Sequence, residues 1–463
     1  MTTTLASPYD RVIDRVRAAA APRVSGRVGR VVGLNLEVEG LDAAIGDGLE
    51  VHTAKGRLPL EVVAVGDRGL VSMPFGDLTG VGVGDPVTAT GSTATIRVGD
   101  ALLGRVLDGL GRPIDDGPPL EVRGSDDPSG PGLVEVGIDG TPPHPLRRRR
   151  VDTPLGLGVR AVDTLITCGQ GQRMGIFAGS GVGKSSLLSM IARGSEADVT
   201  VLALIGERGR EVAEFIEHDL GPEGLARSVV VVATSDQPAL VRLRAAFVAT
   251  RIAEHFRDQG RDVLLMMDSL TRFAMAQREV GLSAGEPPAT RGYPPSVFTL
   301  LPKLLERAGC GETGSITGLY TVLVEGDDMQ DPVGDTARSI LDGHIVLSRR
   351  LATAGHFPTI DVLESASRVA GRVTSPENAA AATELRRLMA ALRDARDLVD
   401  IGAYAAGSNP DVDRALQLDG AITRFLRQPL GEQTHPELAW RTLRQILGHG
   451  RTDAGVPMAG GER

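Results

Sequence analysis

The sequence predicts an α/β protein whose core is a parallel sheet, preceded by a small N-terminal β-barrel and followed by a C-terminal helical bundle. Three observations support this fold class. Short β-branched runs recur between turn signals in residues 24–91, a pattern typical of a small barrel. Near-continuous apolar runs of strand type alternate with helical patterns in residues 151–350, as expected for a parallel sheet covered on both faces. After about residue 375 the apolar residues repeat at helical spacing.

The N-terminal segment, residues 1–22, predicts a short amphipathic helix. Tyr9, Val12, Ile13 and Val16 fall on one helical face, and charged residues occupy the rest. Pro22 then separates this helix from the next element. The helix therefore either packs on its own domain or binds a separate protein, and the sequence leaves both open.

The domain boundaries follow from changes in composition along the chain. We expect the barrel in residues 23–92 and the α/β domain in residues 93–375. The α/β domain begins with an irregular proline-rich connection, residues 105–150. Ser375 and Pro376 form a helix start signal, so the helical domain covers residues 376–463.

The most specific motif is Ala178-Gly-Ser-Gly-Val-Gly-Lys-Ser185. Its small residues let successive backbone N–H groups converge on phosphate oxygens, and the closing lysine and hydroxyl suit a triphosphate and Mg²⁺. A strand pattern precedes the motif and a helical pattern follows it, which is the context this loop requires. The core is therefore predicted to be a P-loop NTPase that takes ATP and Mg²⁺. We expect the nucleotide to contact Gly179, Ser180, Gly181, Val182, Gly183, Lys184, Ser185 and Ser186.

Two further strand ends supply candidates for the chemistry. Asp268 ends the apolar run 263–267, which is the setting of a carboxylate that holds Mg²⁺ together with Ser185. Glu207 follows the run 199–205, at the sheet edge where open α/β sheets bind ligands, and is a candidate for polarising the attacking water. Its neighbour Arg208 is a candidate phosphate ligand. A structural salt bridge is the competing interpretation for both residues.

Composition argues against several classes of protein. The formal net charge is −9 and aromatic residues make up 3% of the chain, which disfavours nucleic acid as the main partner. Cys168 and Cys310 are too few for a disulfide framework, and neither lies in a metal-type cluster. We see no secretory signal and no apolar run near the ~18 residues of a membrane helix. The expected location is the cytoplasm.

Several blocks together resemble the flagellum-specific and type III secretion ATPases, over roughly residues 24–430. They are Gly206-Glu-Arg-Gly-Arg-Glu-Val212, Ala233-Thr-Ser-Asp-Gln-Pro238, Asp268-Ser-Leu-Thr-Arg-Phe273, Pro288-Ala-Thr-Arg-Gly-Tyr-Pro-Pro295, Val324-Glu-Gly-Asp-Asp328, Leu103-Gly-Arg-Val-Leu-Asp-Gly-Leu-Gly-Arg-Pro113 and Asp342-Gly-His-Ile-Val-Leu347. That family is related to the catalytic subunits of rotary F-type ATP synthases. The resemblance implies a subunit of a homohexameric ring with nucleotide at subunit boundaries.

The resemblance also implies residue roles. Glu207 matches the family's catalytic glutamate and Lys184 its P-loop lysine. Arg368, in Ser365-Ala-Ser-Arg-Val369, matches the arginine that reaches into a neighbour's site. Phe357 matches the aromatic residue that stacks on adenine, where many relatives carry tyrosine; phenylalanine keeps the π face and loses the hydroxyl.

The function implied is ATP hydrolysis that drives flagellar protein export from the inner face of the cell membrane. The implied partners are exported flagellar proteins with their chaperones, a peripheral regulator on the N-terminal helix, a coiled-coil stalk protein and a membrane export gate. The nearest alternative is the same enzyme in a virulence-type secretion system. A non-hydrolysing ring subunit and a hexameric RNA translocase are weaker alternatives, because Lys184 and Glu207 are both present and the chain is acidic.

Overall fold

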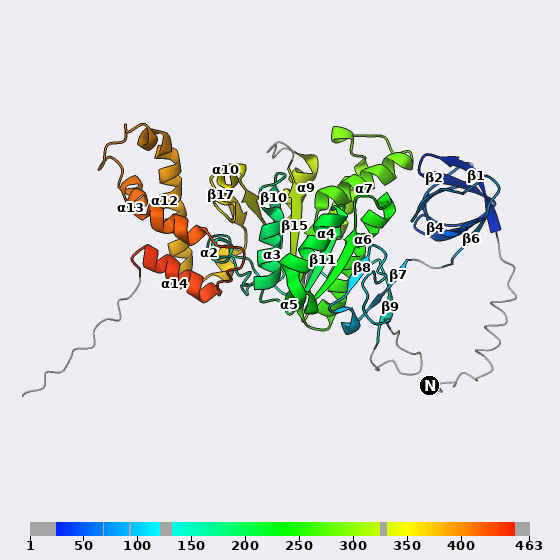
Figure 1. Ribbon diagram of the computed structural model, residues 1–463, viewed down its shortest axis with the longest axis horizontal. Coiled ribbons are helices and arrows are strands. Elements are labelled where there is room, and N and C mark those ends of the chain that lie inside the picture. Colours follow the sequence, from blue (N-terminus) through cyan, green and yellow to red (C-terminus); the bar gives the residue numbers. More distant parts are fainter. Residues whose placement is uncertain (1–24, 68, 92–93, 121–131, 325–330, 450–463) are drawn as a thin grey trace, which may run out of the picture. The chain divides into compact units, whose positions relative to one another are not determined.

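The computed structural model describes residues 25–67, 69–91, 94–120, 132–324 and 331–449 (Figure 1). The helix predicted for residues 1–22 lies outside these residues, as do most of the block 324–328 and the end of the chain from residue 450. The chain divides into two compact units, Met1–Ala94 with Leu282–Glu286, and Thr95–Gly281 with Pro287–Arg463.

The first unit contains the predicted barrel, which is confirmed. Its strands close in the order β1-β2-β5-β4-β3-β6. Apolar and polar residues alternate along them, so that Val28, Leu36, Leu49 and Val62 are fully buried inside the barrel. The strands are β1 (Ser25–Val32), β2 (Asn35–Glu39), β3 (Gly48–Thr53), β4 (Gly56–Gly66), β5 (Gly69–Pro74) and β6 (Pro86–Ala89).

The second unit is built on the predicted sheet, whose order is β17-β16-β10-β15-β13-β11-β12-β8 with β14 paired to β15. All seven residues of β11 are buried, which shows that both faces are covered. The strands are β8 (Val106–Asp108), β10 (Arg173–Ala178), β11 (Val199–Ile205), β12 (Ser228–Ala233), β13 (Asp262–Asp268), β14 (Gly309–Cys310), β15 (Ser315–Leu323), β16 (Gly343–Leu347) and β17 (Ile360–Ser367). A separate ribbon pairs β7 (Thr95–Val98) with β9 (Val134–Gly137).

The sheet departs from the prediction at two strands. β17 runs antiparallel to β16, and β14 runs antiparallel to β15. The other pairs are parallel, so the carboxyl ends of β10, β11 and β13 meet at one edge. One short helix connects β16 to β17. A connection of this kind favours an antiparallel pair, because a parallel pair needs a longer crossover.

Helices cover the sheet, and α6 packs against β11, β12 and β13. The helices of this part are α2 (Arg160–Leu165), α3 (Lys184–Gly194), α4 (Gly209–Glu214), the π-helix η2 (Phe215–Leu220), α5 (Gly221–Ala226), α6 (Ala239–Asp258), α7 (Leu270–Ser283), α8 (Pro295–Leu305), α9 (Pro332–Ile340), α10 (Arg349–Thr353) and α11 (Ala370–Val373), with 3-10 turns η1 (Asp100–Leu102) and η3 (Thr290–Gly292).

The helical C-terminal part is confirmed and consists of α12 (Pro376–Asp400), α13 (Pro410–Leu426) and α14 (Pro436–Ile446). Ser375 caps α12 as predicted, because its side chain accepts a hydrogen bond from the backbone N–H of Asn378. Leu385 and Leu388 of α12 are fully buried. The exact domain boundaries stay a prediction.

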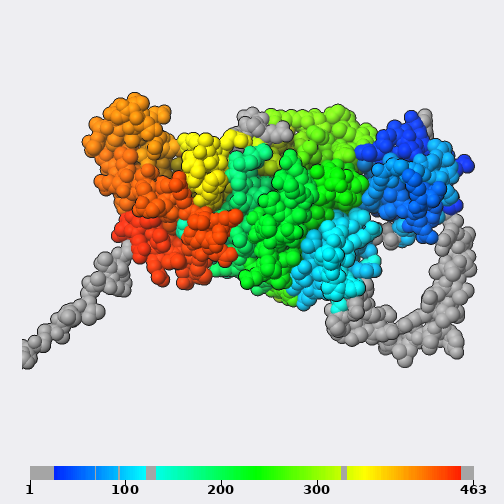
Figure 2. All heavy atoms as spheres, viewed as in Figure 1, coloured from blue at the N-terminus to red at the C-terminus, as the bar shows by residue number. Residues whose placement is uncertain are grey.

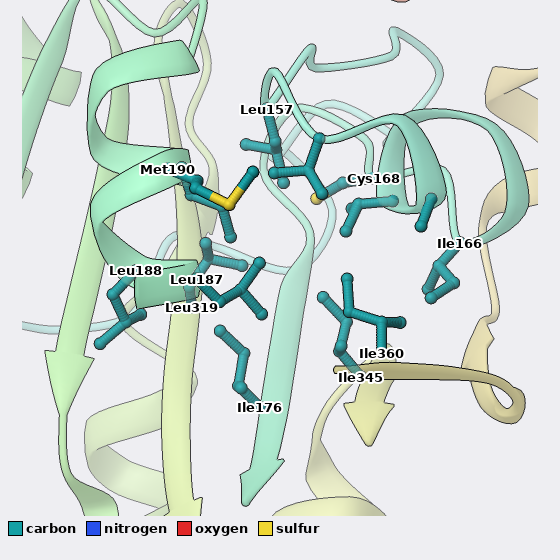
Figure 3. Close-up of a cluster of buried hydrophobic side chains, with 14 of the residues drawn as sticks. Leu157, Ile166, Cys168, Ile176, Leu187, Leu188, Met190, Leu319, Ile345 and Ile360 are labelled. Carbon is teal, nitrogen blue, oxygen red and sulfur yellow. The ribbon is translucent and has the colours of Figure 1, made fainter. Parts of the chain in front are cut away.

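One hydrophobic cluster joins the sheet to the C-terminal helices. Side chains from α3, β10, β15, β16 and β17 meet in its centre, among them Leu187, Ile176 and Ile360 (Figure 3). The same cluster continues through Leu385 of α12 and Phe425 of α13. Figure 2 shows the surface of these helices, in orange and red, running into that of the sheet domain. The sheet and the C-terminal helices therefore share one hydrophobic core.

Candidate active site

The loop between β10 and α3 has the conformation that the phosphate-binding motif predicts. Gly181 and Gly183 have φ angles of 73° and 97°, in the left-handed region that favours glycine. Between them Val182 is buried and anchors the loop. Gly179 is also buried, whereas Ser180 and Gly181 face solvent. The loop is therefore exposed at Ser180 and Gly181, while the buried side chain of Val182 fixes its position.

Helix α3 begins at Lys184, directly after this loop. Its first turn exposes Ser185 and Ser186, and its unpaired backbone N–H groups and partial positive charge lie at the same end. A helix N-terminus of this kind favours an anion, so the local structure suits a phosphate group.

Lys184 connects the loop to two acidic strand ends. Its Nζ atom lies 2.5 Å from Oδ1 of Asp268 and 3.1 Å from Oε1 of Glu207. Burial by itself lowers the pKa of Lys184, but the two carboxylates outweigh burial and raise the pKa above its ordinary value. Lys184 is therefore fully charged and held at the carboxyl edge of the sheet.

Glu207 lies in the turn between β11 and α4, after Gly206, whose φ is 70°. Its side chain is only 16% exposed. Burial and the nearby Asp268 carboxylate raise the pKa of Glu207 above its ordinary value, against the opposing effect of Lys184. A buried carboxylate with a raised pKa has the character of a group that accepts a proton or orients a water.

Asp268 ends β13 and is also buried, with its Oδ1 accepting a 2.7 Å hydrogen bond from Oγ1 of Thr321. Thr321 belongs to β15, the neighbouring parallel strand, and has no exposed surface. Thr321 is not among the site residues predicted from the sequence. The sequence pattern does not mark Thr321 as a site residue, because threonine is common within the apolar strands of a buried sheet.

Arg208 is not brought to Lys184. Its side chain is 77% exposed and its Nη1 donates to Oε1 of Glu211 at 3.2 Å. Arg272 on α7 lies closer to the turn, since a methyl group placed on Gly206 would touch the Arg272 side chain at 3.0–3.2 Å. The Nε atom of Arg272 is buried and has no hydrogen-bond partner. Arg272 is thus a second positive side chain beside Glu207, and the sequence analysis did not single it out.

Phe357 is brought to the phosphate-binding loop from the segment before β17. Its ring is so close to Gly183 that a methyl group there would touch it at 3.7 Å. Oγ1 of Thr359 donates to the carbonyl of Val182 at 2.6 Å and fixes this approach. The Phe357 side chain remains 49% exposed, which leaves part of the ring free beside the loop.

Arg368 follows the far end of β17. Ser367 pairs with Gly343, and His344 pairs with Gly175, so Arg368 lies near the amino end of β10. The loop begins four to five residues further along β10, a distance of about 15 Å along the strand. Arg368 is exposed, and its Nη2 donates to the carbonyl of Arg338 at 3.4 Å. It does not reach Lys184 of its own chain.

Comparison with known proteins identifies the family of this chain. Residues 158–367 match the ATP synthase alpha/beta family, nucleotide-binding domain, and residues 374–445 match the T3SS EscN ATPase C-terminal domain. The chain is 48% identical to the flagellum-specific ATP synthase of Bacillus subtilis (strain 168), over 95% of this chain and 98% of the relative. The chain belongs to the flagellum-specific and type III secretion ATPase family.

Other relatives of both kinds are equally similar. The type 3 secretion system ATPase of Xanthomonas euvesicatoria is 50% identical over 89% of this chain and 91% of its own length. The assembled ATPase EscN of enteropathogenic E. coli matches in structure with a TM-score of 0.85 at 47% identity, over 91% of this chain and all of EscN. EscN in complex with its central stalk EscO matches with a TM-score of 0.82 at 46% identity and the same coverage. The predicted resemblance, fold and ATPase activity are confirmed.

The residues of this ATPase site also fit Mg²⁺. The buried Asp268 carboxylate lies 2.5 Å from the Lys184 ammonium group, and the Ser185 hydroxyl is exposed at the start of α3. Within the described ranges no cluster of three or more His, Cys, Asp or Glu side chains could hold a metal ion alone. Mg²⁺ commonly uses one or two protein ligands together with substrate phosphates, and this set of residues has that form.

Among the helices of the described part of this ATPase, none is long and apolar enough to cross a membrane.

Proposed function

We propose that this ATPase works as a homohexameric ring in which Arg368 of one subunit completes the nucleotide site of the next, and that the ring drives flagellar protein export. The observation that carries the proposal is the position of Arg368: it is exposed at the end of the sheet opposite the phosphate-binding loop. An arginine that its own site cannot use is available to a neighbour. EscN, which this chain matches over 91% of its length, has been solved as an assembled ATPase.

Within each site, the phosphate-binding loop and Lys184 hold the triphosphate, and Ser186 and Phe357 complete the nucleotide contacts. Ser185 and Asp268 would hold Mg²⁺, which supplies positive charge to the phosphates. Glu207 orients and polarises the attacking water, and its Oε1 lies 3.1 Å from the Lys184 Nζ that faces the phosphates.

Binding of the triphosphate replaces the carboxylate contacts of Lys184 with contacts to the phosphates. Its ammonium group is paired with Asp268 and Glu207. When the phosphates take up the ammonium group, the Glu207 carboxylate is released to face the water. Arg208, which now pairs with Glu211 at the surface, would have to rotate inward to contact phosphate.

The wider setting follows from the family. We place the ring in the cytoplasm, peripherally at the inner face of the cell membrane, with exported flagellar proteins and their chaperones as cargo. A regulator on residues 1–22, a coiled-coil stalk and a membrane export gate complete the assembly, without nucleic acid. The stalk is supported by EscN, which has been solved with its central stalk EscO. A virulence-type system is the second candidate, because the type 3 secretion relative is as similar as the flagellar one.

The test is the specific ATPase activity of the purified chain over a wide range of protein concentration, with oligomer mass followed in parallel. An arginine supplied in trans is worth roughly 10³- to 10⁵-fold in rate, so the isolated subunit should be nearly inactive and activity should rise with assembly. High activity that stays constant while the protein remains monomeric would rule out the shared site. Assembled rings without activity would favour a non-hydrolysing or partner-dependent subunit.

A further inference from the structure

The segment that connects α13 to α14, residues 427–435, is fastened to the nucleotide-binding domain at several points. Nη2 of Arg193, on the helix that follows the phosphate-binding loop, donates to the carbonyl of Leu430 at 2.8 Å. The guanidinium group of Arg160 donates to the carbonyls of Phe425 and Arg427 at 2.8 Å and 2.5 Å. The connection therefore does not behave as a free surface loop; it is a bound part of the nucleotide-binding domain.

Gln428 is the centre of this attachment and is 2% exposed. Its side-chain Oε1 accepts a hydrogen bond from the backbone N–H of Arg160 at 2.9 Å. Its Nε2 donates to the carbonyl of Gly158 at 2.7 Å and to the carbonyl of Glu432 at 2.8 Å. Both amide hydrogens and the amide oxygen are used, so the position of Gln428 is determined by three side-chain hydrogen bonds.

From this position Gln428 reaches the aromatic residue beside the phosphate-binding loop. Its backbone N–H donates to the carbonyl of Phe357 at 2.9 Å. On its other side, the segment that carries Phe357 is held by the 2.6 Å hydrogen bond from Thr359 to the carbonyl of Val182. The backbone at the base of the Phe357 ring is thus held between the phosphate-binding loop and Gln428, while the ring itself stays 49% exposed.

We propose that Gln428 is a positioning residue for the nucleotide base: it holds Phe357 where its ring stacks on a purine, and so makes the α13–α14 connection a determinant of ATP affinity. The inference rests on the proposed function, in which Phe357 stacks on the base. Gln428 is 2% exposed and hydrogen-bonds to protein groups, so in this proposal it touches neither the base nor the phosphates. Its effect therefore falls on the recognition of the base and leaves the transfer of the phosphoryl group unchanged.

The experiment compares ATP with Mg²⁺-tripolyphosphate, a probe that carries the phosphates without a base. In the assembled full-length chain, Gln428→Met keeps the volume and loses all three side-chain hydrogen bonds. Base–aromatic stacking predicts an increase of about 5- to 30-fold in the KM for ATP, with kcat nearly unchanged. The inhibition constant of tripolyphosphate against ATP hydrolysis should not change, a separation that a general loss of structure would not produce.

Two further variants make the result decisive. Phe357→Ala should raise the KM for ATP in the same way, and the double variant should be no worse than Phe357→Ala alone, because both changes remove one contact. Gln417→Met, an exposed glutamine on α13, is the matched control and should leave both constants unchanged. If the methionine variant does not fold, as judged by thermal unfolding and oligomer mass, Gln428→Glu retains the acceptor for Arg160 and takes its place.

The outcomes separate the two proposals. A raised KM for ATP in Phe357→Ala and an unchanged one in the Gln428 variants would overturn the positioning role and leave the stacking of Phe357 intact. An unchanged KM in Phe357→Ala would overturn the stacking itself, and the positioning role with it. A parallel loss of affinity for ATP and tripolyphosphate in the Gln428 variants would show that Gln428 supports the phosphate-binding loop instead of the base.

Discussion

Phe357 lies three residues before the strand β17 and Arg368 directly after it, so the eight residues of that strand, about 25 Å of extended chain, lie between them. The Phe357 ring lies beside Gly183 of the phosphate-binding loop of its own subunit, and Arg368 is exposed at the other edge of the sheet. One strand therefore separates the residue proposed for the subunit's own nucleotide from the residue proposed to be available to a neighbour.

Arg368→Ala should lower the rate of ATP hydrolysis roughly 10³- to 10⁵-fold. ATP binding should be nearly unchanged. Mixing this variant with Lys184→Ala, which is also inactive alone, should restore activity. About one quarter of the wild-type rate is expected, because about one boundary in four of a random ring joins an intact Lys184 to an intact Arg368. Steady-state ATPase assays of the mixtures measure this. Arg372→Ala, at an exposed arginine on α11, is the control, and mixtures that stay inactive would argue against a shared site.

Glu207→Gln should lose hydrolysis by about 10²- to 10⁴-fold, because the water loses the group that accepts its proton. ATP should bind at least as tightly as before, since a negative charge next to Lys184 is removed. Fluorescent nucleotide titration and a phosphate-release assay separate the two effects. Weak ATP binding together with lost hydrolysis would instead assign Glu207 to the structure of the site.

The pH dependence of hydrolysis should reflect the raised pKa of Glu207. A base must be unprotonated to act, so kcat/KM should fall as the pH drops through a pKa above the ordinary value of 4.5. The control is the pH dependence of ATP binding by Glu207→Gln, which shows whether substrate binding fails in the same range. An acidic limb at or below the ordinary glutamate range would show that Lys184 outweighs burial and Asp268 in setting the pKa of Glu207.

Thr321→Val should remove one of the two hydrogen bonds to the buried Oδ1 of Asp268 and leave the one from Lys184. We expect a loss of about 1–3 kcal/mol in the free energy of unfolding and a higher Mg²⁺ requirement for hydrolysis. Thr317→Val is the matched control: it lies on the same strand and loses a hydrogen bond from the backbone N–H of Gly171 at 2.8 Å. Equal Mg²⁺ dependence in the two variants would mean that Thr321 serves only stability.

Asp163 predicts a pH-dependent stability of the second unit. Burial and Glu196 raise its pKa to about 7, although backbone N–H groups of Leu157 and Gly158 oppose the rise. The folded chain then binds this proton more tightly than the unfolded chain, so the free energy of unfolding falls as pH rises between about 4 and 7, by at most about 1.4 kcal/mol per pH unit. Asp163→Asn should flatten this decline in thermal unfolding experiments, whereas Asp42→Asn on the exposed barrel surface should not. An unchanged slope in Asp163→Asn would show that another group carries the dependence.

The sequence by itself determined the parts of the site that short segments encode. The glycines of the phosphate-binding loop, the helix that begins at Lys184, and the acidic residues at the ends of β11 and β13 all follow from patterns of a few residues. Parallel strands place their carboxyl ends at one edge, so local patterns were sufficient to expect Glu207 and Asp268 at that edge, without their contacts to Lys184. The family resemblance added Phe357 and Arg368 as residues, without their positions.

Only the tertiary structure decided how distant segments meet. Thr321 reaches Asp268 because β15 is the neighbour of β13, and Gln428 reaches Phe357 because the α13–α14 connection folds back onto α2 and the segment before β17. The antiparallel return of β17 sends Phe357 to the phosphate-binding loop and Arg368 away from it. Strand order and direction depend on packing between segments far apart in the chain, and no pattern within a short window of sequence records them.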